Sequence, residues 1–247
     1  MFSHATARLL ILGGLLVLLA ALWRRDALPP PQALQAAVRE EPLQQPTALA
    51  PFSTTAGGIT YTIKPVFDYD ISGLVVSRHD TSAWWDWIHA AWNDHLNVAD
   101  LCVVFGDNAR TGAYLGVRFH SGQFVCEAST DSAQAWQAFS MAALSNNHLL
   151  TDRPAAARLL RELRPGDQVR IRGELAEYGH NHGQPFWRGT SVTRTDTGNG
   201  ACETIWVREV QVLARGGGPW RLLFPMGGGA MLAGVALWLL LPIRVRD

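Results

Sequence analysis

The sequence lacks an excess of charge of either sign. Its 21 Lys and Arg residues balance 21 Asp and Glu residues, and Lys64 is the only lysine. A nucleic-acid-binding domain normally carries a basic face or stripe. We therefore expect no nucleic-acid partner.

The sequence also lacks the short motifs that mark common enzymes. It has no nucleophile elbow, P-loop, dinucleotide fingerprint or H-E-x-x-H. It has no C-x-x-C, which disfavours a thioredoxin-like redox centre or a zinc ribbon. These absences favour a non-enzymatic binding or scaffolding protein. They predict no cofactor, and the sequence does not identify a small-molecule ligand.

Two long apolar runs stand near the ends of the chain. Residues 9–23 and 222–243 carry no charged side chain, and about 20 such residues cross a bilayer. The second run predicts a transmembrane helix. The first predicts a transmembrane helix or signal anchor, since Arg24 and Arg25 follow it without a small-x-small cleavage site; a cleaved signal peptide is the alternative. The lipid bilayer is thus an expected partner.

The two runs divide the chain into parts. We expect cytoplasmic tails at 1–8 and 244–247, a Pro-rich linker at 24–58, a globular domain at 59–214 and a Gly-rich joint at 215–221. An eight-residue amino tail is most simply left in the cytoplasm. We therefore predict a two-pass protein of the bacterial inner membrane, with its middle domain outside the cytoplasm. A cytoplasmic-facing regulatory domain is the alternative.

The middle of the chain has the patterns of a mixed fold. Tyr61 and Ile63 alternate with polar residues, as do Val169 and Ile171, which is typical of half-buried strands. About six strands and three helices are expected, which predicts an α+β fold with a mainly antiparallel, barrel-like sheet.

Seven of the ten tryptophans lie between Trp84 and Trp206, so the domain is Trp-rich. The stretch "TSAWWDWIHAAWNDHL" predicts a helix that buries Trp84, Trp92 and His95 on one face and exposes Asp86 and His89 on the other. The stretch "LSNNHLLTD" predicts the end of one helix and the cap of the next. The alternative is a polar cluster of Asn146, Asn147 and His148 that lines a cleft.

Two resemblances add to this. At residues 165–175, "PGDQVRIRGEL" resembles the strand entry of small β-barrels such as the OB-fold. "DLCVVFG", "SNNHLL", "GDQVRIRGEL" and "DTGNGACE" together resemble an uncharacterised family of bacterial membrane-anchored proteins. This resemblance covers most of the middle domain and implies no known activity.

The three cysteines allow three single pairs. Cys102 and Cys126 lie on neighbouring expected strands and are the preferred disulfide, because a domain outside the cytoplasm permits one. Three buried thiols are the alternative. Cys202 alternates with Trp206, which favours a packed thiol over a reactive one.

Histidine and acidic residues supply the candidates for chemistry. If the protein is a metal-dependent or acid/base hydrolase, the candidate catalytic residues are His89, Asp86, His148, Arg194, Asp196 and Glu203. The candidate metal ligands are His180 and His182 in "GHNHG". The alternative interpretation is a solvated loop for the histidine pair and a solvent-facing stripe for Asp86 and His89.

The stretch "TRTDTGNGACETIWV" combines turn and site features. Asn-Gly at 199–200 is a tight-turn signal, so we expect a hairpin in which Arg194 and Glu203 pair across the strands. This hairpin belongs to a site only if His148 or the His180/His182 loop lies beside it.

Overall fold

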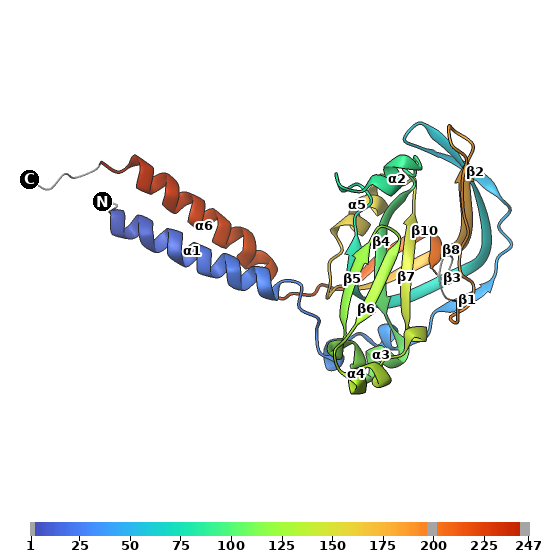
Figure 1. Cartoon of the computed structure of the whole chain (residues 1–247), viewed down its shortest axis with the longest axis horizontal. Coiled ribbons are helices and arrows are strands. Elements are labelled where there is room, and N and C mark those ends of the chain that lie inside the picture. The colour runs from blue at the N-terminus through green and yellow to red at the C-terminus, as the bar shows by residue number, and fades with distance from the viewer. Residues whose placement is uncertain (1–2, 197–201, 243–247) are drawn as a thin grey trace, which may run out of the picture. The chain divides into compact units, whose positions relative to one another are not determined.

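A computed structural model describes residues 3–196 and 202–242 and divides the chain into two compact units. One unit holds the residues up to Ala27 and from Gly216 onward, and the other is Leu28–Arg215 (Figure 1). The turn expected at 198–200 lies outside the described residues.

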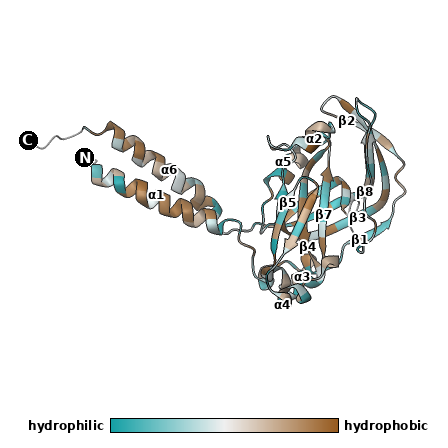
Figure 2. Cartoon of the chain, in the orientation of Figure 1, coloured by the Kyte–Doolittle hydropathy of each residue, from teal (hydrophilic) through white to brown (hydrophobic). Residues whose placement is uncertain are grey.

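The first unit is a pair of apolar helices, α1 (His4–Arg24) and α6 (Trp220–Leu240). Both are long and apolar enough to cross a membrane, and the hydropathy colouring of Figure 2 marks most of their length as hydrophobic. They pack closely through small residues: a Cβ added to Gly14 would lie 2.6 Å from the backbone nitrogen of Met231, and one added to Gly234 would lie 2.9 Å from the Ala7 carbonyl oxygen. His4 Nε2 lies 3.3 Å from the Pro242 carbonyl oxygen, so the helices run antiparallel, with the start of α1 beside the end of α6.

The second unit is built on five strands that hydrogen-bond in a closed ring. Around the ring the order is β3, β4, β7, β10, β8 and back to β3. All neighbours are antiparallel except β7 and β10, which are parallel. The ring strands are β3 (Ile59–His79), β4 (Asn97–Val104), β7 (Leu144–Leu150), β8 (Gln168–His180) and β10 (Glu203–Ala214). The expected α+β fold with a mainly antiparallel, barrel-like sheet is confirmed.

Strand β3 closes the ring because it is 21 residues long and bends. Its pairing with β8 shifts register between Pro65 and Phe67, and its pairing with β4 shifts between Val75 and Ser77. Glycine permits the tight approach of strands: a Cβ on Gly173 of β8 would lie 1.9 Å from the Trp206 carbonyl oxygen.

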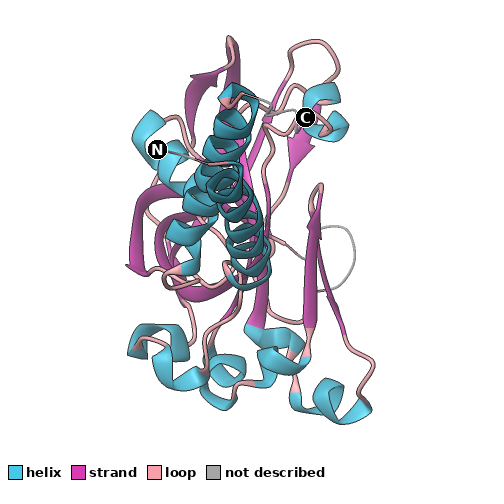
Figure 3. Ribbon diagram, turned by 90° about the vertical axis from the view of Figure 1, so that its left-hand side faces the viewer, coloured by secondary structure: helices cyan, strands magenta, loops and turns pink. Residues whose placement is uncertain are grey.

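Shorter elements surround the ring, and Figure 3 shows several helical turns gathered at one end of the strands. The short strands are β1 (Leu43–Pro46), β2 (Phe52–Ala56), β5 (Arg118–Gly122), β6 (Val125–Ser129) and β9 (Phe186–Arg188). The short helices are α2 (Trp87–Ala91), α3 (Gly106–Thr111), α4 (Ala133–Ala138) and α5 (Pro154–Glu162), with 3-10 turns η1 (Pro31–Ala33), η2 (Ala36–Arg39), η3 (Ala113–Gly116) and η4 (Met141–Ala143).

The segment expected to be a linker, 24–58, differs from that expectation. From Leu28 it belongs to the globular unit, Leu34 and Val38 are buried, and β1 and β2 both pair with β3. Leu34 and Val38 join the apolar cluster that includes Leu74 and Val104 of the barrel strands, while Leu43 and Leu49 stay exposed.

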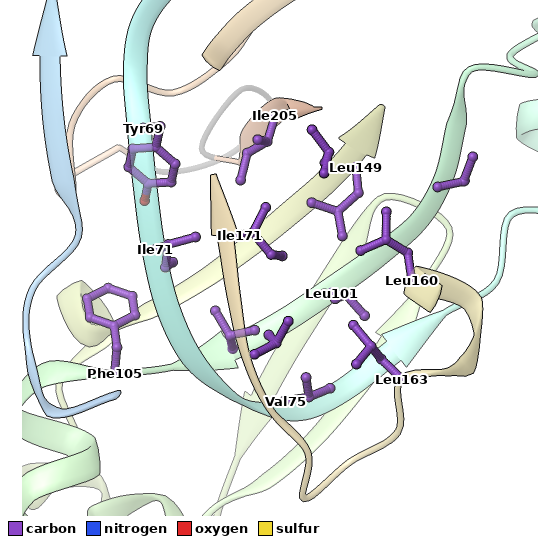
Figure 4. Packing of buried hydrophobic residues seen from close by; sticks show 14 of the residues in the cluster. Tyr69, Ile71, Val75, Leu101, Phe105, Leu149, Leu160, Leu163, Ile171 and Ile205 are labelled. Atoms are coloured by element: carbon purple, nitrogen blue, oxygen red, sulfur yellow. The ribbon is translucent and has the colours of Figure 1, made fainter. Parts of the chain in front are cut away.

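The main apolar core fills the ring (Figure 4). Ile71, Leu101 and Ile171 from three strands meet Leu160 and Leu163, which come from α5 and the residue after it. Helix α5 thus stands between β7 and β8 in the chain and contributes to the core of the barrel.

The helix expected over residues 81–96 is wrong in extent and in orientation. Only Trp87–Ala91 forms a helix, Asp86 and His89 are buried, and Trp84 is 94% exposed. Asp86 caps the helix by accepting a hydrogen bond from the His89 backbone nitrogen at 3.0 Å. The polar partners of these two side chains, described below, reverse the burial that periodicity predicts.

The helix end expected at "LSNNHLLTD" is also wrong. Residues Leu144–Leu150 form β7, a central strand of the ring that pairs with both β4 and β10. Six of its seven residues are buried, and the amides of Asn146 and Asn147 find partners within the sheet and its loops.

Candidate functional site

A continuous series of buried polar side chains runs from β3 to the loop after β8. Buried polar groups are costly unless each is hydrogen-bonded, so such a series marks either a specific structural device or a site. It consists of three groups, which we name the Asp86 cluster (His79, Asp86 and His89), the connecting Asn97, and the Asp100 relay (Asp100, His148 and Cys202).

In the Asp86 cluster one carboxylate oxygen holds two imidazoles. Asp86 Oδ2 lies 2.6 Å from His79 Nε2 and 2.6 Å from His89 Nδ1. The three side chains are no more than 5% exposed, and their ligand atoms all lie within 4.8 Å of one another. Two imidazoles and a carboxylate are a donor set that suits zinc and similar cations.

Asn97 joins the cluster to the relay. Its Nδ2 lies 3.1 Å from His89 Nε2 and donates to Asp100 Oδ1 at 2.8 Å. Since Nδ2 has only hydrogens to offer, His89 Nε2 accepts, and the ring proton of His89 sits on Nδ1 facing Asp86. The side-chain amide of Asn97 therefore sets the tautomer of His89 in the Asp86 cluster.

In the Asp100 relay, Asp100 Oδ1 lies 2.6 Å from His148 Nδ1, and neither side chain is exposed. Burial alone would raise the pKa of Asp100 and lower that of His148. The ion pair reverses both effects: the pKa of Asp100 is lowered to about 2 and that of His148 is raised. Because Nδ1 faces the carboxylate, His148 Nε2 is the atom directed at other groups.

Arg188 meets the outer edge of His148, and its Nη2 donates to Nε2 at 2.6 Å. Cys202 Sγ accepts from Asn146 Nδ2 at 3.4 Å and lies 3.9 Å from the Phe124 carbonyl oxygen. Burial opposes ionisation of Cys202, but the nearby His148 and the Asn146 amide outweigh burial and lower the pKa of the thiol. The packed thiol expected from the alternation of Cys202 with Trp206 stays a prediction.

Phe124 organises these groups from the turn between β5 and β6. Its φ is +62°, a left-handed conformation that a bulky residue adopts only when its surroundings compel it. The backbone nitrogen donates to Asp100 Oδ2 at 3.1 Å, and its carbonyl accepts from Asn146 Nδ2 at 3.1 Å. The ring stacks on His89 at 4.0 Å, and the Arg188 guanidinium lies 4.1 Å from the ring centre. The strained turn therefore positions both carboxylate and arginine.

Two clefts open beside the relay, and Cys202 lines both. The apolar cleft, about 640 Å³, is lined on one side by Phe124, Val125, Met141 and Leu144, and on the other by Asn146, Arg194 and Glu203. The tryptophan cleft, about 500 Å³, is lined by Trp92, Phe186, Trp187 and Arg188. Clefts of this size with a few convergent polar groups are typical of small-molecule sites.

The expected pair Arg194 and Glu203 is present and borders the apolar cleft. The Arg194 guanidinium contacts Glu203 Oε1 and the Tyr69 hydroxyl, and Ser145 Oγ donates to Glu203 Oε2 at 2.5 Å. Burial raises the pKa of Glu203 even though Arg194 opposes the shift. These groups satisfy one another, which indicates a wall of the cleft more than a reacting centre.

The structure does not bring the other candidates together with the relay. His180 uses both ring nitrogens locally: Nε2 lies 2.8 Å from the Trp92 carbonyl oxygen, and Nδ1 accepts from the His182 backbone at 3.2 Å. His182 is exposed. Asp196 is also exposed and accepts hydrogen bonds from Ser191 and Thr193. The described geometry therefore gives no common metal centre to His180 and His182.

Sequence reasoning missed His79, Asn97, Asp100, Phe124 and Arg188 as site residues. Most lie in strands or loops where local pattern shows only a polar residue in an apolar context. One usable signal was present: "SGQFVC" places a large aromatic residue at a two-residue turn between strands, where Gly, Asn or Asp would be usual.

The three cysteines have distinct states. Cys102 of β4 and Cys126 of β6 are joined by a disulfide, with their Cα atoms 5.8 Å apart, and Cys202 is free.

Comparison of the chain with models of protein families, with curated proteins and with solved structures gives no match. The site is therefore interpreted from its own chemistry.

Proposed function

We propose that this chain is a membrane-anchored envelope protein whose barrel domain binds an amphipathic small molecule carrying a carboxylate. The apolar part of the ligand lies in the apolar cleft on Phe124, Met141 and Leu144, and its carboxylate reaches past Cys202, which lines both clefts, to Arg188 of the tryptophan cleft. This extends the interpretation of the sequence as a binding protein by giving the ligand a chemical class.

The observation that carries the proposal is Arg188. This side chain lines the tryptophan cleft next to Cys202, and its contacts are an imidazole nitrogen and an aromatic face. In the part of the chain that the structure describes, none of its contacts is a carboxylate. A half-buried guanidinium facing a cleft without an acidic partner is suited to bind an anion.

The strand order supports placing the ligand here. We infer that the ring is an OB-type barrel, because its third and fifth strands in chain order, β7 and β10, pair in parallel and a helix lies between its third and fourth strands. In OB-folds the ligand face comprises strands two and three with the loops after strands one and four. Here these are β4, β7 and the segments 80–96 and 181–202, which supply Trp92, Asp100, His148 and Arg188.

The proposal places the domain outside the cytoplasm of the bacterial inner membrane, anchored by α1 and α6. The disulfide of Cys102 and Cys126 supports that compartment, since disulfides persist where thiols are not kept reduced. The proposal retains an envelope protein as a partner, and the exposed indoles of Trp84, Trp85 and Trp87 support such a contact surface.

The test is photocrosslinking with a diazirine-bearing octanoate on the full chain in lipid nanodiscs. We expect adducts in the peptides around Phe124 and Met141–Asn146, in addition to adducts on the membrane helices from probe dissolved in the bilayer. Arg188→Gln should weaken competition by octanoate about tenfold while leaving competition by octanol unchanged, because only the carboxylate contacts the guanidinium. Arg118→Gln, which alters an exposed arginine paired with Asp131, is the matched control. Adducts confined to α1 and α6 would refute the proposal.

A second candidate function is favoured by the Asp86 cluster. We propose that His79, Asp86 and His89 hold a divalent cation such as Zn²⁺ through the atoms that now meet at Asp86 Oδ2, with the proton of each imidazole moving to its other ring nitrogen. Asn97 would then turn its Oδ1, which is buried without a partner among the described residues, toward His89 Nε2. Three protein ligands leave one position of a tetrahedral zinc, and the burial of the three side chains favours a structural role over a hydrolytic centre open to substrate. Stoichiometric metal in the purified full chain, lost in His79→Gln, is the expected result.

A further inference from the structure

We propose that the ligand of the barrel domain carries a hydroxyl group on the third carbon, counted from its carboxylate, and that Asn146 recognises this hydroxyl. The ligand class is thereby narrowed from amphipathic carboxylates to 3-hydroxy carboxylates with an apolar chain. This inference deepens the proposed function and rests on it, because the ligand must lie in the apolar cleft with its carboxylate at Arg188.

The first support is the fixed orientation of the Asn146 amide. Its Nδ2 lies 3.1 Å from the Phe124 carbonyl oxygen and 3.4 Å from Cys202 Sγ. A carbonyl oxygen can only accept a hydrogen bond, so the amide atom that faces Phe124 must be the nitrogen. The amide cannot turn over without setting its own oxygen against that carbonyl. Oδ1 of Asn146 is therefore held away from Phe124.

The second support is that Oδ1 has no donor. Among the residues that the structure describes, Asn146 Oδ1 is buried without a hydrogen-bond partner, and the residue as a whole is 8% exposed. Asn146 nevertheless lines the apolar cleft, next to Phe124 and Leu144. A buried acceptor without a donor costs free energy. Asn146 thus offers the cleft an acceptor that a saturated acyl chain leaves unpaired and a hydroxyl on that chain satisfies.

A hydroxyl suits this wall better than an amide does. An amide N–H would also satisfy Asn146, but its carbonyl oxygen would need a donor of its own in the cleft. The guanidinium of Arg194, which lines the same cleft, already contacts Glu203 and Tyr69. The hydroxyl brings the donor without this further demand.

The third support is the spacing of the two polar anchors. Asn146 and His148 lie two residues apart on β7, in regular register with β4, so their side chains share a face of the strand at a separation of about 7 Å. The Arg188 guanidinium contacts His148 Nε2 at 2.6 Å and marks the place of the carboxylate. A ligand that reaches both anchors makes a hydrogen bond of about 2.8 Å at each end. Only a short carbon segment then separates the carboxylate from the hydroxyl, as in a 3-hydroxy acid.

The arrangement also distinguishes mirror images. The carboxylate binds at Arg188, the chain lies on Phe124, Met141 and Leu144, and the hydroxyl binds at Asn146. Three substituents of the carbon that bears the hydroxyl are thus fixed at three separate places, and only one enantiomer can fill all three. The two enantiomers have the same polarity and enter a bilayer almost equally, so a difference between them reports the protein.

The experiment measures how well unlabelled acids compete with the diazirine-bearing octanoate on the full chain in lipid nanodiscs. The competitors are octanoate and the two enantiomers of 3-hydroxyoctanoate, and the adducts are counted in the peptides around Phe124 and Met141–Asn146. We expect one enantiomer to compete about tenfold better than octanoate and the other to gain nothing. The 3-methoxy ether of the better enantiomer should lose the gain, because it has no proton to donate.

Two variants assign the effect to a residue. Asn146→Leu keeps the approximate shape of the side chain and removes Oδ1, so the two enantiomers should compete equally. Asn181→Leu alters an exposed asparagine in the loop after β8 and should preserve the preference. The comparison of enantiomers and of the ether uses the wild type, so it does not depend on the folding of a variant.

The outcomes separate this inference from the proposed function. If octanoate displaces the probe from the cleft and both enantiomers compete equally in the wild type, the recognition of a hydroxyl is refuted and the proposed function stands. If folded Asn146→Leu keeps the full preference, the assignment to Asn146 is overturned. If none of the acids displaces the probe from the cleft, the proposed function fails, and this inference fails with it.

Discussion

The Asp86 cluster and the Asp100 relay are built from the same parts but end differently. In each, a buried aspartate accepts hydrogen bonds from an imidazole at 2.6 Å and from a backbone nitrogen. The second partner of Asp86 is another imidazole, within a sealed group. The histidine of Asp100 meets Arg188 at its other ring nitrogen, and Arg188 lines a cleft together with Cys202. The same carboxylate–imidazole pair is thus sealed in one group and borders a cleft in the other.

The largest expected effect on this comparison comes from removing either carboxylate. Asp100→Ala leaves a buried imidazole and amide without an acceptor, and we expect the free energy of unfolding to fall by about 3–5 kcal/mol. Asp86→Ala should cost a similar amount for the same reason. Denaturant unfolding of the full chain in detergent measures both. The two variants should differ in the reactivity of the Cys202 thiol, because only Asp100→Ala should change the pH profile of its alkylation. An equal change in both variants would mean that the Asp86 cluster and the Asp100 relay act as one unit.

A metal should act on the Asp86 cluster alone. Zn²⁺ at about 100 times its dissociation constant should raise the free energy of unfolding by about 2.7 kcal/mol. His79→Gln should remove this gain, while His148→Gln should keep it. Thermal melting of the wild type and the two variants with and without Zn²⁺ checks this, and loss of the gain in both variants would place the cation at the relay.

Acid should weaken the Asp100 relay in a defined range. The folded-state pKa of Asp100 is lowered from 3.8 to about 2, so its contribution is present above pH 4 and is lost as the pH falls through about 2. A shift of this size corresponds to about 2 kcal/mol. Urea unfolding of wild type and Asp100→Asn between pH 5 and pH 2 isolates it: the wild type should lose more stability over this range, and parallel curves would contradict the ion pair.

The smallest expected effect concerns the turn that serves both groups. Phe124 contacts His89 and Arg188 through its ring, while its backbone has a positive φ. Phe124→Ala loses the ring and keeps the strain, whereas Phe124→Gly loses the ring and relieves it. We expect the glycine variant to be more stable than the alanine variant by about 1 kcal/mol, as measured by denaturant unfolding. Equal stability would mean that the turn has relaxed in both.

The sequence predicted the fold class better than it predicted the site. Alternation at Tyr61 and Ile63 and at Val169 and Ile171 indicated strands of β3 and β8, because a half-buried sheet imposes a period of two on its own residues. The same reasoning failed over 81–96, where Asp86 is buried against His79 of β3 and His89 is buried against the ring of Phe124. Periodicity reports the average face of a helix, and it contains no information about an imidazole on β3 that will pair with Asp86.

The candidate residues show the same division. The sequence predicted the pair of Arg194 and Glu203 and a shared face for Asp86 and His89. It did not predict the contact of His148 with Asp100. Asp100 and Arg188 were missed because nothing beside them in the chain distinguishes them from ordinary polar residues. Only the pairing of β4 with β7 sets Asp100 opposite His148.

The sequence by itself determined the local features: apolar runs long enough for α1 and α6, strand alternation, balanced charge and three cysteines. These follow from side-chain chemistry over a few neighbouring residues. The tertiary structure decided which polar groups meet, because the ring closure of β3 with β8 and the strained turn at Phe124 bring together residues 48 positions apart, as in Asp100 and His148, and more. Burial then supplies what no local pattern contains: a low-dielectric setting in which an aspartate, a histidine and a cysteine change one another's proton affinity.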